Sequence, residues 1–410
     1  MPETTNPEEM GFDRRRLERI GAFLKETYID TGRLPNAQVL VARDGKCVYE
    51  ASLGTLNARG DTLPEDAIFR IASMTKPVTS IAFMQLVEQC KVALDAPITR
   101  LLPEFASAGV YAGGGGATPF ATPRAARPIR FVDLLTHMAG LTYGLQNRTN
   151  VDAAYRDQKL DLPRELSSDD YLAKLAKLPL QHPPGERWNY SVATDVLGVA
   201  VERITGQKLG DYFREHIFGP LGMNDTAFDL PEQARGRLAD SFALAPGGST
   251  ILAESGAESV HFQPSAFHSG GGGLVSTAAD YHRFCSMLLA GGSLDGVQIV
   301  SPKTLDLMTA NHLPGGADLA EMSDALFSEA SNAGTGFGLG FAVVIDPART
   351  LMPASRGEFH WGGAYSTAFF VDPVERITMV FMTQLYPSTA YPIRRQLKTL
   401  IYSALKVSHA

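Results

Sequence analysis

The sequence reads FRIASMTKP at residues 69–77 and places Ser73 three residues before Lys76. Side chains three apart lie on one face of a helix, so the lysine amine can reach the serine hydroxyl. Pro77 is tolerated only in a first turn, so the helix must begin very near Ser73. Free backbone N–H groups at such a start favour a developing negative charge. The stretch therefore predicts a serine nucleophile with a lysine partner at the start of a buried helix.

Two features of the chain limit this interpretation. A serine in this position can instead be a helix cap without a catalytic role, and this is the alternative interpretation of Ser73. A second S-x-x-K runs from Ser403 to Lys406, but it falls in the last turns of a terminal helix without a partner motif, and we interpret it as a solvated face. A competing Ser-His-Asp site lacks its best support, because the usual hydrolase elbow motif G-x-S-x-G is absent from the chain.

Strand patterns occur towards both ends of the chain. Short apolar runs at 37–42 and 47–51 flank Asp44-Gly45, a strong hairpin signal, and further strands are expected at 338–345, 365–371 and 376–383. We therefore predict an α/β (α+β) fold with one antiparallel sheet built from both chain termini and flanked by helices. The expected sheet domain comprises residues 1–82 and 291–410, an inserted mainly helical domain comprises 83–290, and the active site lies between them.

Helical periodicity fills most of the remaining chain, and a breaker-rich segment interrupts it. The segment 107–128 contains four consecutive glycines and three prolines, so we expect an exposed loop there. The expected helices cover residues 13–28, 73–90, 131–138, 168–178, 194–204, 209–218, 277–289 and 391–406.

The composition excludes several classes of protein. The 410 residues are 44% hydrophobic and carry a net charge of 37 − 44 = −7, so the basic excess of a nucleic-acid-binding surface is missing. No apolar stretch approaches the length of a membrane span, and no secretory signal is visible. Cys47, Cys90 and Cys285 are scattered, as in a reduced cytosolic protein. We expect a cytoplasmic protein with no nucleic-acid or membrane partner.

Two further segments can complete a site around Ser73. Tyr190 lies in PPGERWNYSV at 183–192, a rigid turn that would hold its phenol oxygen at a fixed point, although one of thirteen tyrosines is by itself more often core. HWGGAY at 360–365 places two glycines before an expected strand, where substrate can approach the backbone closely and a backbone N–H can face Ser73. A glycine there can also be only a turn.

These elements in this order resemble the serine β-lactamase and penicillin-binding-protein superfamily, whose motifs are S-x-x-K, Y-x-N and K-T-G. The similar stretches LLTHMAGL at 134–141, FGPLGM at 218–223 and GGGLVST at 271–277 extend the resemblance over roughly residues 10 to 405. Two departures stand out: Val192 replaces the amide of Y-x-N, and Trp361-Gly362-Gly363 replaces the charged third motif. An indole offers apolar surface and one N–H donor but no charge, so a neutral substrate fits better.

With these departures the chain looks most like the family VIII carboxylesterases and related acyltransferases. The resemblance implies Ser73 as nucleophile, Lys76 and Tyr190 as the base system, and the backbone N–H groups of Ser73 and Ala364 as the oxyanion hole. We place Trp361, Gly362, Gly363 and His360 at the substrate, although a strand-edge role for His360 is the stronger account. No metal and no cofactor are expected.

Three functions remain open at this stage. The first is a carboxylesterase for short to medium hydrophobic acyl esters, working through a Ser-Lys-Tyr acyl-enzyme and with weak β-lactamase activity as a side reaction. The second is an acyltransferase or a D-stereospecific amidase or peptidase on the same scaffold. The third is a non-catalytic scaffold protein, which the intact Ser73, Lys76 and Tyr190 disfavour. The physiological substrate, chain-length limit, stereopreference and oligomeric state are not written in these motifs.

Overall fold

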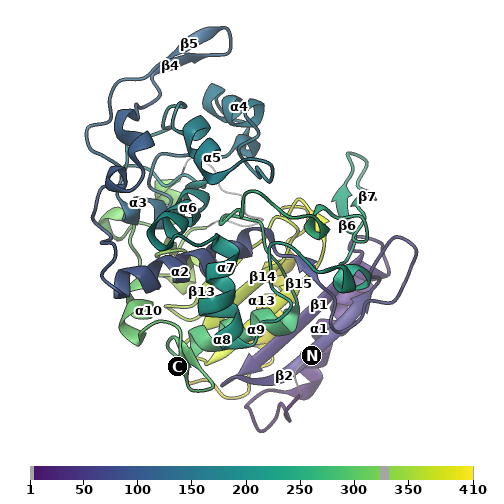
Figure 1. The fold of residues 1–410 in the computed structure, drawn as a ribbon. Coiled ribbons are helices and arrows are strands. Elements are labelled where there is room, and N and C mark those ends of the chain that lie inside the picture. The colour runs from purple at the N-terminus through teal and green to yellow at the C-terminus, as the bar shows by residue number, and fades with distance from the viewer. Residues whose placement is uncertain (1–3, 324–331, 410) are drawn as a thin grey trace.

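The computed structural model describes residues 4–323 and 332–409. Its centre is a seven-stranded antiparallel sheet in the order β11-β12-β13-β14-β15-β1-β2 (Figure 1). Strands from both ends of the chain pair directly, because β15 lies beside β1, so the predicted α/β fold is confirmed. The strands are β1 (Asn36–Arg43), β2 (Lys46–Gly54), β11 (Thr335–Phe337), β12 (Ala342–Val344), β13 (Phe359–Gly362), β14 (Ala368–Asp372) and β15 (Ile377–Met382).

The β1–β2 hairpin turns where the sequence predicts it. Asp44 and Gly45 both have positive φ, 51° and 76°, as a two-residue hairpin turn of this hand requires. Every residue of β1 is buried, because helices cover the sheet on both faces at this strand. Val39 and Val41 pack with the terminal helices, whereas Leu40 and Ala42 belong to a separate small cluster on the other face.

Two of the later strands differ from the sequence expectation. Of the strand expected at 338–345, only β12 (Ala342–Val344) forms; β11 (Thr335–Phe337) precedes the expected segment, and a turn in which Gly340 has a φ of 99° joins the two strands. The strand expected at 365–371 begins only at Ala368, and the glycines of the HWGG segment end strand β13 instead of preceding a strand. Periodicity missed these limits because short buried strands with turn glycines between them look like one continuous apolar run.

Helices are present in every segment where periodicity predicts them, and in several segments where it does not. Short 3-10 and π turns extend some of them, among them the 3-10 turn η2 (Ala72–Met74) before α2. The helices are α1 (Arg14–Leu24), α2 (Thr75–Glu88), α3 (Phe131–Leu135), α4 (Asn150–Asp157), α5 (Ser168–Leu175), α6 (Ala193–Thr205), α7 (Leu209–Phe213), α8 (Gly219–Leu221), α9 (Ala278–Leu289), α10 (Pro302–Met308), α11 (Leu319–Met322), α12 (Pro347–Thr350) and α13 (Ile393–Ser403).

Within residues 4–323 and 332–409, four small sheets lie outside the main one. The segment 107–128 is not the irregular loop expected from its composition, because β4 and β5 form a hairpin that extends from the body (Figure 1). Its glycines supply the positive φ angles that such a tight hairpin needs. The small strands are β3 (Phe69–Arg70) with β8 (Val275–Ser276), β4 (Gly113–Gly115) with β5 (Thr118–Ala121), β6 (Ser241–Leu244) between β7 (Thr250–Glu254) and β16 (Leu385–Tyr386), and β9 (Ser293–Leu294) with β10 (Val297–Gln298).

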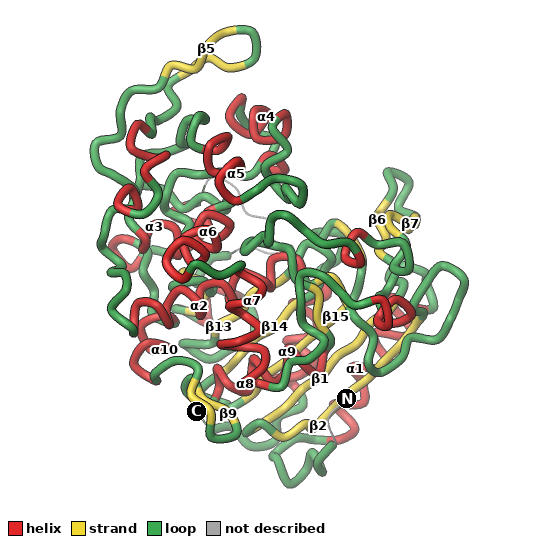
Figure 2. The backbone as a smooth tube through the Cα atoms, viewed as in Figure 1, coloured by secondary structure: helices red, strands yellow, loops and turns green. Residues whose placement is uncertain are grey.

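Two hydrophobic cores lie on opposite faces of the sheet, whose strands are drawn in yellow in Figure 2. Helices α1 and α13 pack together and cover one face with Leu17, Ile20, Leu397 and neighbouring side chains. Helix α9 contacts β14 and β15 on the other face, where α2, α6 and α7 continue the larger core into the helical part of the chain. The active-site segments 69–77 and 188–192 belong to this second core, so the site forms on the α2 and α6 side of the sheet.

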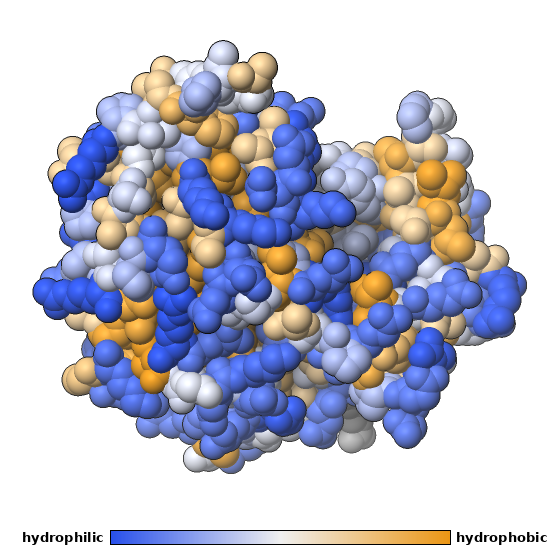
Figure 3. All heavy atoms as spheres, turned by 45° about the horizontal axis from the view of Figure 1, so that its top comes forward, coloured by the Kyte–Doolittle hydropathy of each residue, from blue (hydrophilic) through white to orange (hydrophobic). Residues whose placement is uncertain are grey.

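The domain boundaries stay a prediction. Residues 1–3, 324–331 and 410 fall within the predicted sheet domain and lie outside the described residues. Within the described ranges, no helix combines the length and apolar character that a bilayer crossing demands. Figure 3 shows a mostly hydrophilic face with a hollow between the helical part and the β6–β7 hairpin, where Ile251 and Leu252 are exposed.

Candidate active site

Ser73 lies at the junction between the turn η2 and the helix α2. The residue before it, Ala72, has a φ of 43°, a left-handed backbone conformation that costs a residue with a Cβ roughly 1 kcal/mol or more. The site's cavity includes Ser73 and Ala72 in its wall. The strained turn therefore presents the Ser73 hydroxyl at the cavity, as the position of the helix start predicts.

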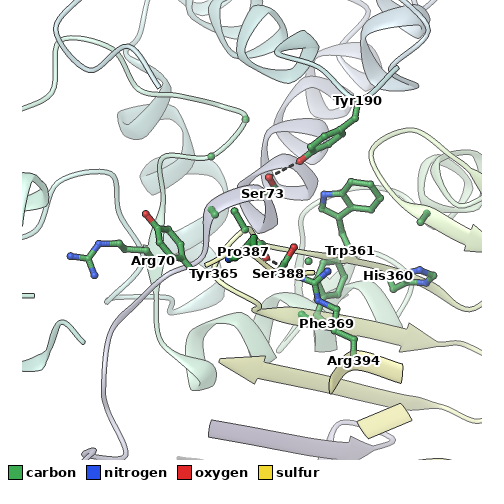
Figure 4. A pocket seen from close by; sticks show the side chains of 18 of the residues that line it. Arg70, Ser73, Tyr190, His360, Trp361, Tyr365, Phe369, Pro387, Ser388 and Arg394 are labelled. Carbon is green, nitrogen blue, oxygen red and sulfur yellow. Dashed lines mark hydrogen bonds between the residues drawn. The ribbon is translucent and has the colours of Figure 1, made fainter. Parts of the chain in front are cut away.

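The Ser73 hydroxyl has two polar partners that come from other turns of the chain. The phenol of Tyr190 donates to Ser73 Oγ at 2.5 Å (Figure 4). The amine of Lys76 donates to the same oxygen at 3.1 Å. The structure thus brings together the alcohol, the amine and the phenol that the sequence analysis placed in one site.

Lys76 is buried, with only 2% of its surface exposed. Besides Ser73 Oγ, its Nζ donates to Tyr143 Oη at 3.0 Å and to the carbonyl oxygen of Gly271 at 2.6 Å. Nζ also lies 4.6 Å from the centre of the Tyr190 ring, within cation–π range. Three acceptors around one nitrogen match the three hydrogens of an ammonium group.

Tyr190 is fixed from its backbone side. Gln146 donates its side-chain amide to the Tyr190 carbonyl oxygen, and the neighbouring Asn189 donates its amide to Leu141 O at 2.8 Å and its backbone N–H to His137 O at 2.9 Å. These bonds tie the segment 188–192, just before α6, to the 137–146 segment. The rigid turn predicted around Tyr190 is therefore held by hydrogen bonds from a separate part of the chain.

An aromatic wall packs beside Tyr190. Its ring lies 5.6 Å from Trp361 and 6.1 Å from Trp188, and Phe337 lies 5.4 Å from both indoles. His137 packs against the same rings. Burial and the charge of Lys76 hold the pKa of His137 well below its usual range, so this histidine is neutral. The wall is therefore apolar and uncharged, as expected for a hydrophobic substrate.

The glycines after Trp361 serve a close approach within the protein. A Cβ on Gly363 would stand less than 3.0 Å from the carbonyl oxygen of Ile71 and from Thr367 Oγ1, and one on Gly362 would meet the Arg394 guanidinium. We expected these glycines to admit substrate to the backbone. They let the end of β13 pack on the turn that carries Ser73, and Gly362, Gly363 and Ala364 all lie in the cavity wall, so close access of substrate to this backbone stays a prediction.

Trp361 and His360 occupy opposite faces of β13, as neighbours in a strand must. Trp361 faces Tyr190 and Ser73, whereas His360 points away from them (Figure 4). On its own face His360 Nδ1 lies 3.7 Å from Glu358, and burial chiefly lowers the pKa of His360 to about 3. The structure therefore brings Trp361, Gly362 and Gly363 to the nucleophile, whereas His360, which also lines the cavity, lies on the other face of β13, so its role at the substrate stays a prediction.

The cavity is large, and its walls come from both the sheet and the helical part of the chain. Its volume is about 690 Å³, within the usual size range of ligand pockets. The wall includes Ser73, Tyr190 and Trp361 on one side and Leu162, Val260 and Tyr386 further out. These three outer side chains are more than a third exposed. The site can therefore accommodate a hydrophobic molecule considerably larger than the group that reaches Ser73.

Sequence reasoning missed two residues beneath Lys76. Tyr143 accepts a hydrogen bond from Lys76, and the buried Asp195 binds the N–H of Gly271 at 3.1 Å. Burial, reinforced by Asp195, raises the pKa of Tyr143 well above its usual range. Burial also raises the pKa of Asp195, while the charge of Lys76 acts in the opposite direction. The sequence signal that could have pointed to Asp195 is its position as a carboxylate in the first turn of α6, a helix that is otherwise mostly apolar.

Comparison with known proteins agrees with this geometry. A family model described as Beta-lactamase matches residues 20–402, nearly the whole chain. The chain belongs to the beta-lactamase family. This membership confirms the resemblance inferred from S-x-x-K, the Tyr190 segment and the HWGG segment, together with the fold that the resemblance implied.

Several known proteins are similar to this chain over most of their length. Protein Rv1367c of Mycobacterium tuberculosis is 38% identical over 362 residues, which cover 87% of this chain and 88% of that protein. Esterase EstB of Burkholderia gladioli is 32% identical over 388 residues, covering 90% of this chain and 91% of EstB. The solved structure of EstCE1, described as a hydrolase with promiscuous acyltransferase activity, superposes with a TM-score of 0.78 at 27% identity, covering 95% of this chain and 99% of that one.

Proposed function

We propose that the protein is a carboxylesterase that cleaves esters of short to medium hydrophobic acyl groups through an acyl-enzyme on Ser73. One observation carries the proposal: Ser73 Oγ contacts both the Tyr190 phenol at 2.5 Å and the Lys76 amine at 3.1 Å in the wall of a 690 Å³ cavity. The likeness to esterase EstB and to the hydrolase EstCE1 supports the same reaction class.

The proposed cycle has two half-reactions. Ser73 Oγ bonds to the ester carbonyl carbon while its proton passes to the base system of Lys76 and Tyr190. The carbon–alkoxide bond then breaks, the proton returns to the departing alkoxide, and the alcohol leaves an acyl-enzyme. Water attacks the acyl carbon in the same way, its proton passes to Ser73 Oγ, and the carboxylic acid is released.

The oxyanion of each tetrahedral intermediate needs hydrogen-bond donors. We assign this role to the backbone N–H groups of Ser73 and Ala364. The close packing of Gly363 on Ile71 supports this assignment, because it brings the peptide of Ala364 next to the turn that carries Ser73. Loss of one such donor typically lowers the rate by about 10²- to 10³-fold.

The lining of the cavity favours a neutral, hydrophobic substrate. Trp361 presents an indole in place of the superfamily's charged third motif, and Tyr190 and Trp188 continue the aromatic lining beside Ser73, with Phe337 packed behind the two indoles. Gly362 and Gly363 leave the strand end beside the substrate free of side chains. Val192 supplies no amide for an amide substrate, so we assign β-lactam turnover only as a weak side reaction.

Acyl transfer to an alcohol is the second candidate. The volume of the cavity leaves room for an acceptor alcohol beside the acyl group, and EstCE1 is described as having promiscuous acyltransferase activity. Both reactions share the same acyl-enzyme, so they differ only in whether water or an alcohol attacks it.

A substrate panel on purified protein tests the proposal. The panel contains p-nitrophenyl acetate, butyrate and decanoate, nitrocefin and D-amino-acid p-nitroanilides, each with and without 1-butanol. We expect the acetate and butyrate to be turned over fastest, and butyl ester formation would measure acyl transfer. Ser73→Ala should abolish turnover, whereas Ser403→Ala, in the second S-x-x-K, should leave it unchanged. Faster turnover of the anilides or nitrocefin than of the esters would contradict the carboxylesterase assignment.

A further inference from the structure

Asp195 is a buried carboxylate beside the proposed active site that the reaction cycle above does not use. It occupies the first turn of α6, and only 1% of its surface is exposed. Its Oδ1 accepts from Ser269 Oγ at 2.5 Å and from the Gly271 N–H at 3.1 Å. Its Oδ2 is buried and accepts no hydrogen bond from any described residue. Burying a carboxylate without full hydrogen bonding is costly, so a compensating positive charge is expected nearby.

Gly271 links Asp195 to Lys76 directly. Its N–H donates to Asp195 Oδ1 at 3.1 Å, and its carbonyl oxygen accepts from Lys76 Nζ at 2.6 Å. The carboxylate and the amine therefore bind the two polar groups of one residue. Any shift of Asp195 would move the carbonyl group that orients Lys76.

Tyr143 binds Lys76 and lies close to the same glycine as Asp195. A Cβ on Gly271 would stand less than 3.0 Å from both Asp195 Oδ2 and Tyr143 Oη, so both oxygens lie close to the Gly271 backbone. Tyr143 Oη accepts from Lys76 Nζ at 3.0 Å, so its own hydrogen must point elsewhere. Asp195 Oδ2, beside the same glycine, is an acceptor without a donor among the described residues.

The other titratable groups around Lys76 do not supply a negative charge as directly. Tyr143 and Tyr190 are phenols that face Nζ, and His137 is neutral because of burial and the Lys76 charge. Asp161 and Tyr171 act on Tyr143 more weakly than Asp195 does. Asp161 is itself occupied by the N–H groups of Gly144 and Leu145 at 2.8 and 2.9 Å. Asp195 is therefore the carboxylate that best balances a charge on Lys76.

We propose that Asp195 is a positioning residue that keeps Lys76 in its ammonium form and, through Gly271, holds it against Ser73. The inference rests on the proposed function only for its catalytic consequence: with Lys76 already protonated, the Tyr190 oxygen is the group that takes the Ser73 proton. Tyr190 enters this step as a phenolate beside the Lys76 ammonium, takes the Ser73 proton as Oγ bonds to the carbonyl carbon, and as a phenol then gives that proton to the departing alkoxide.

The charge on Lys76 can be measured without an activity assay. Protein labelled with ¹³C and ¹⁵N at lysine is titrated by NMR, and the Lys76 signal is identified by its loss in Lys76→Met. We expect Lys76 to be an ammonium at pH 8 in the wild type. In Asp195→Asn the pH at which half of this signal converts should fall by about one unit or more, since an opposite charge at this range typically contributes that much. Ser269→Ala removes a hydrogen bond to the same carboxylate but no charge, and should leave the midpoint within about 0.3 of a unit.

Two results would overturn the inference. One is a neutral Lys76 at pH 8 in the wild type, which needs no variant and so remains decisive if Asp195→Asn does not fold. The other is an unchanged midpoint in Asp195→Asn. Because neither depends on turnover, they are distinguishable from a failure of the proposed function, which would appear as missing ester hydrolysis. In steady-state kinetics, Asp195→Asn should lower kcat at pH 8 about tenfold or more with little change in KM. Asp195→Glu, which keeps the negative charge, should retain a higher kcat than Asp195→Asn.

Discussion

The main chain of Gly363 packs directly on the carbonyl group of Ile71, with no space for a side chain between them. This contact joins the end of β13 to the turn that presents Ser73, so it sets the distance between the proposed nucleophile and the peptide of Ala364. The two sides of the candidate site come from segments almost 300 residues apart, and their alignment depends on a glycine.

Replacing Gly363 by alanine should therefore damage both catalysis and stability. The added methyl group would overlap Ile71 O and Thr367 Oγ1, and overpacking of this kind typically costs about 1–3 kcal/mol. We expect kcat/KM for p-nitrophenyl butyrate to fall at least about a hundredfold, as for a displaced oxyanion donor. Gly247→Ala is the matched control, since a Cβ there meets nothing within 4 Å. Equal kinetics for Gly363→Ala and the control would contradict this role.

Tyr190→Phe and Lys76→Met should each lower kcat by roughly 10²- to 10⁴-fold, the usual range for general acid–base groups. Because both side chains contact the same Ser73 oxygen, they act as one unit. The double variant should then be little worse than the poorer single variant, since such effects are not additive. Steady-state kinetics on the three proteins measures this. Multiplicative losses would show that the two residues work independently.

Trp361→Phe tests the indole N–H separately from the aromatic surface. Trp361 Nε1 is buried without a hydrogen-bond partner among the described residues, whereas its ring packs 5.6 Å from Tyr190 and 5.4 Å from Phe337. Phenylalanine keeps the ring contacts and removes the donor. We expect kcat/KM to fall about three- to tenfold for esters with an oxygen acceptor near the carbonyl, such as p-nitrophenyl methoxyacetate, in line with one lost hydrogen bond. The butyrate ester should be unaffected. Equal losses on both esters would contradict a donor role.

His282 should make the fold sensitive to acid. It lies buried in α9, and burial, helped by the charge of Arg283, lowers its pKa to about 4. An unfolded chain protonates histidine near pH 6.5, so as the pH falls below 6.5 towards 4 the unfolded state binds more protons and stability is lost. At pH 5 the loss from this residue is about 2 kcal/mol relative to pH 7. His282→Gln should reduce the fall in unfolding free energy between pH 7 and pH 5 by this amount, as measured by urea denaturation. An unchanged pH dependence would refute it.

Local chemistry made some parts of the site predictable from the sequence. Ser73 and Lys76 lie three residues apart at a helix start marked by Pro77, and this spacing alone places both side chains together. Likewise, Asp44-Gly45 determines a hairpin turn through backbone preferences. Tyr190 was a weaker candidate, because the rigid turn around it favours it over the other tyrosines only when Ser73 and Lys76 are considered with it.

Other parts depend on contacts that no local pattern encodes. Asp195 and Tyr143 both pack against Gly271, where a Cβ would clash, and Gly271 binds Lys76 through its carbonyl oxygen, a relationship among four separate segments. Strand β13 ends at Gly362 because Gly363 packs on Ile71, a contact between distant segments. Periodicity does not detect such a contact, so the sequence predicted a strand only after the glycines and missed β13 before them. The β4–β5 hairpin was missed because its glycines and prolines are as typical of an irregular loop as of a tight turn.

The most direct test of the central claim is to locate the acyl group chemically. The protein is mixed with p-nitrophenyl acetate, quenched in acid within the first turnover, digested and examined by peptide mass spectrometry. We predict one acetyl group on the peptide that contains Ser73, a signal that Ser73→Ala lacks and Ser403→Ala retains. An acetyl group on another residue, or ester turnover that persists in Ser73→Ala, would contradict the account.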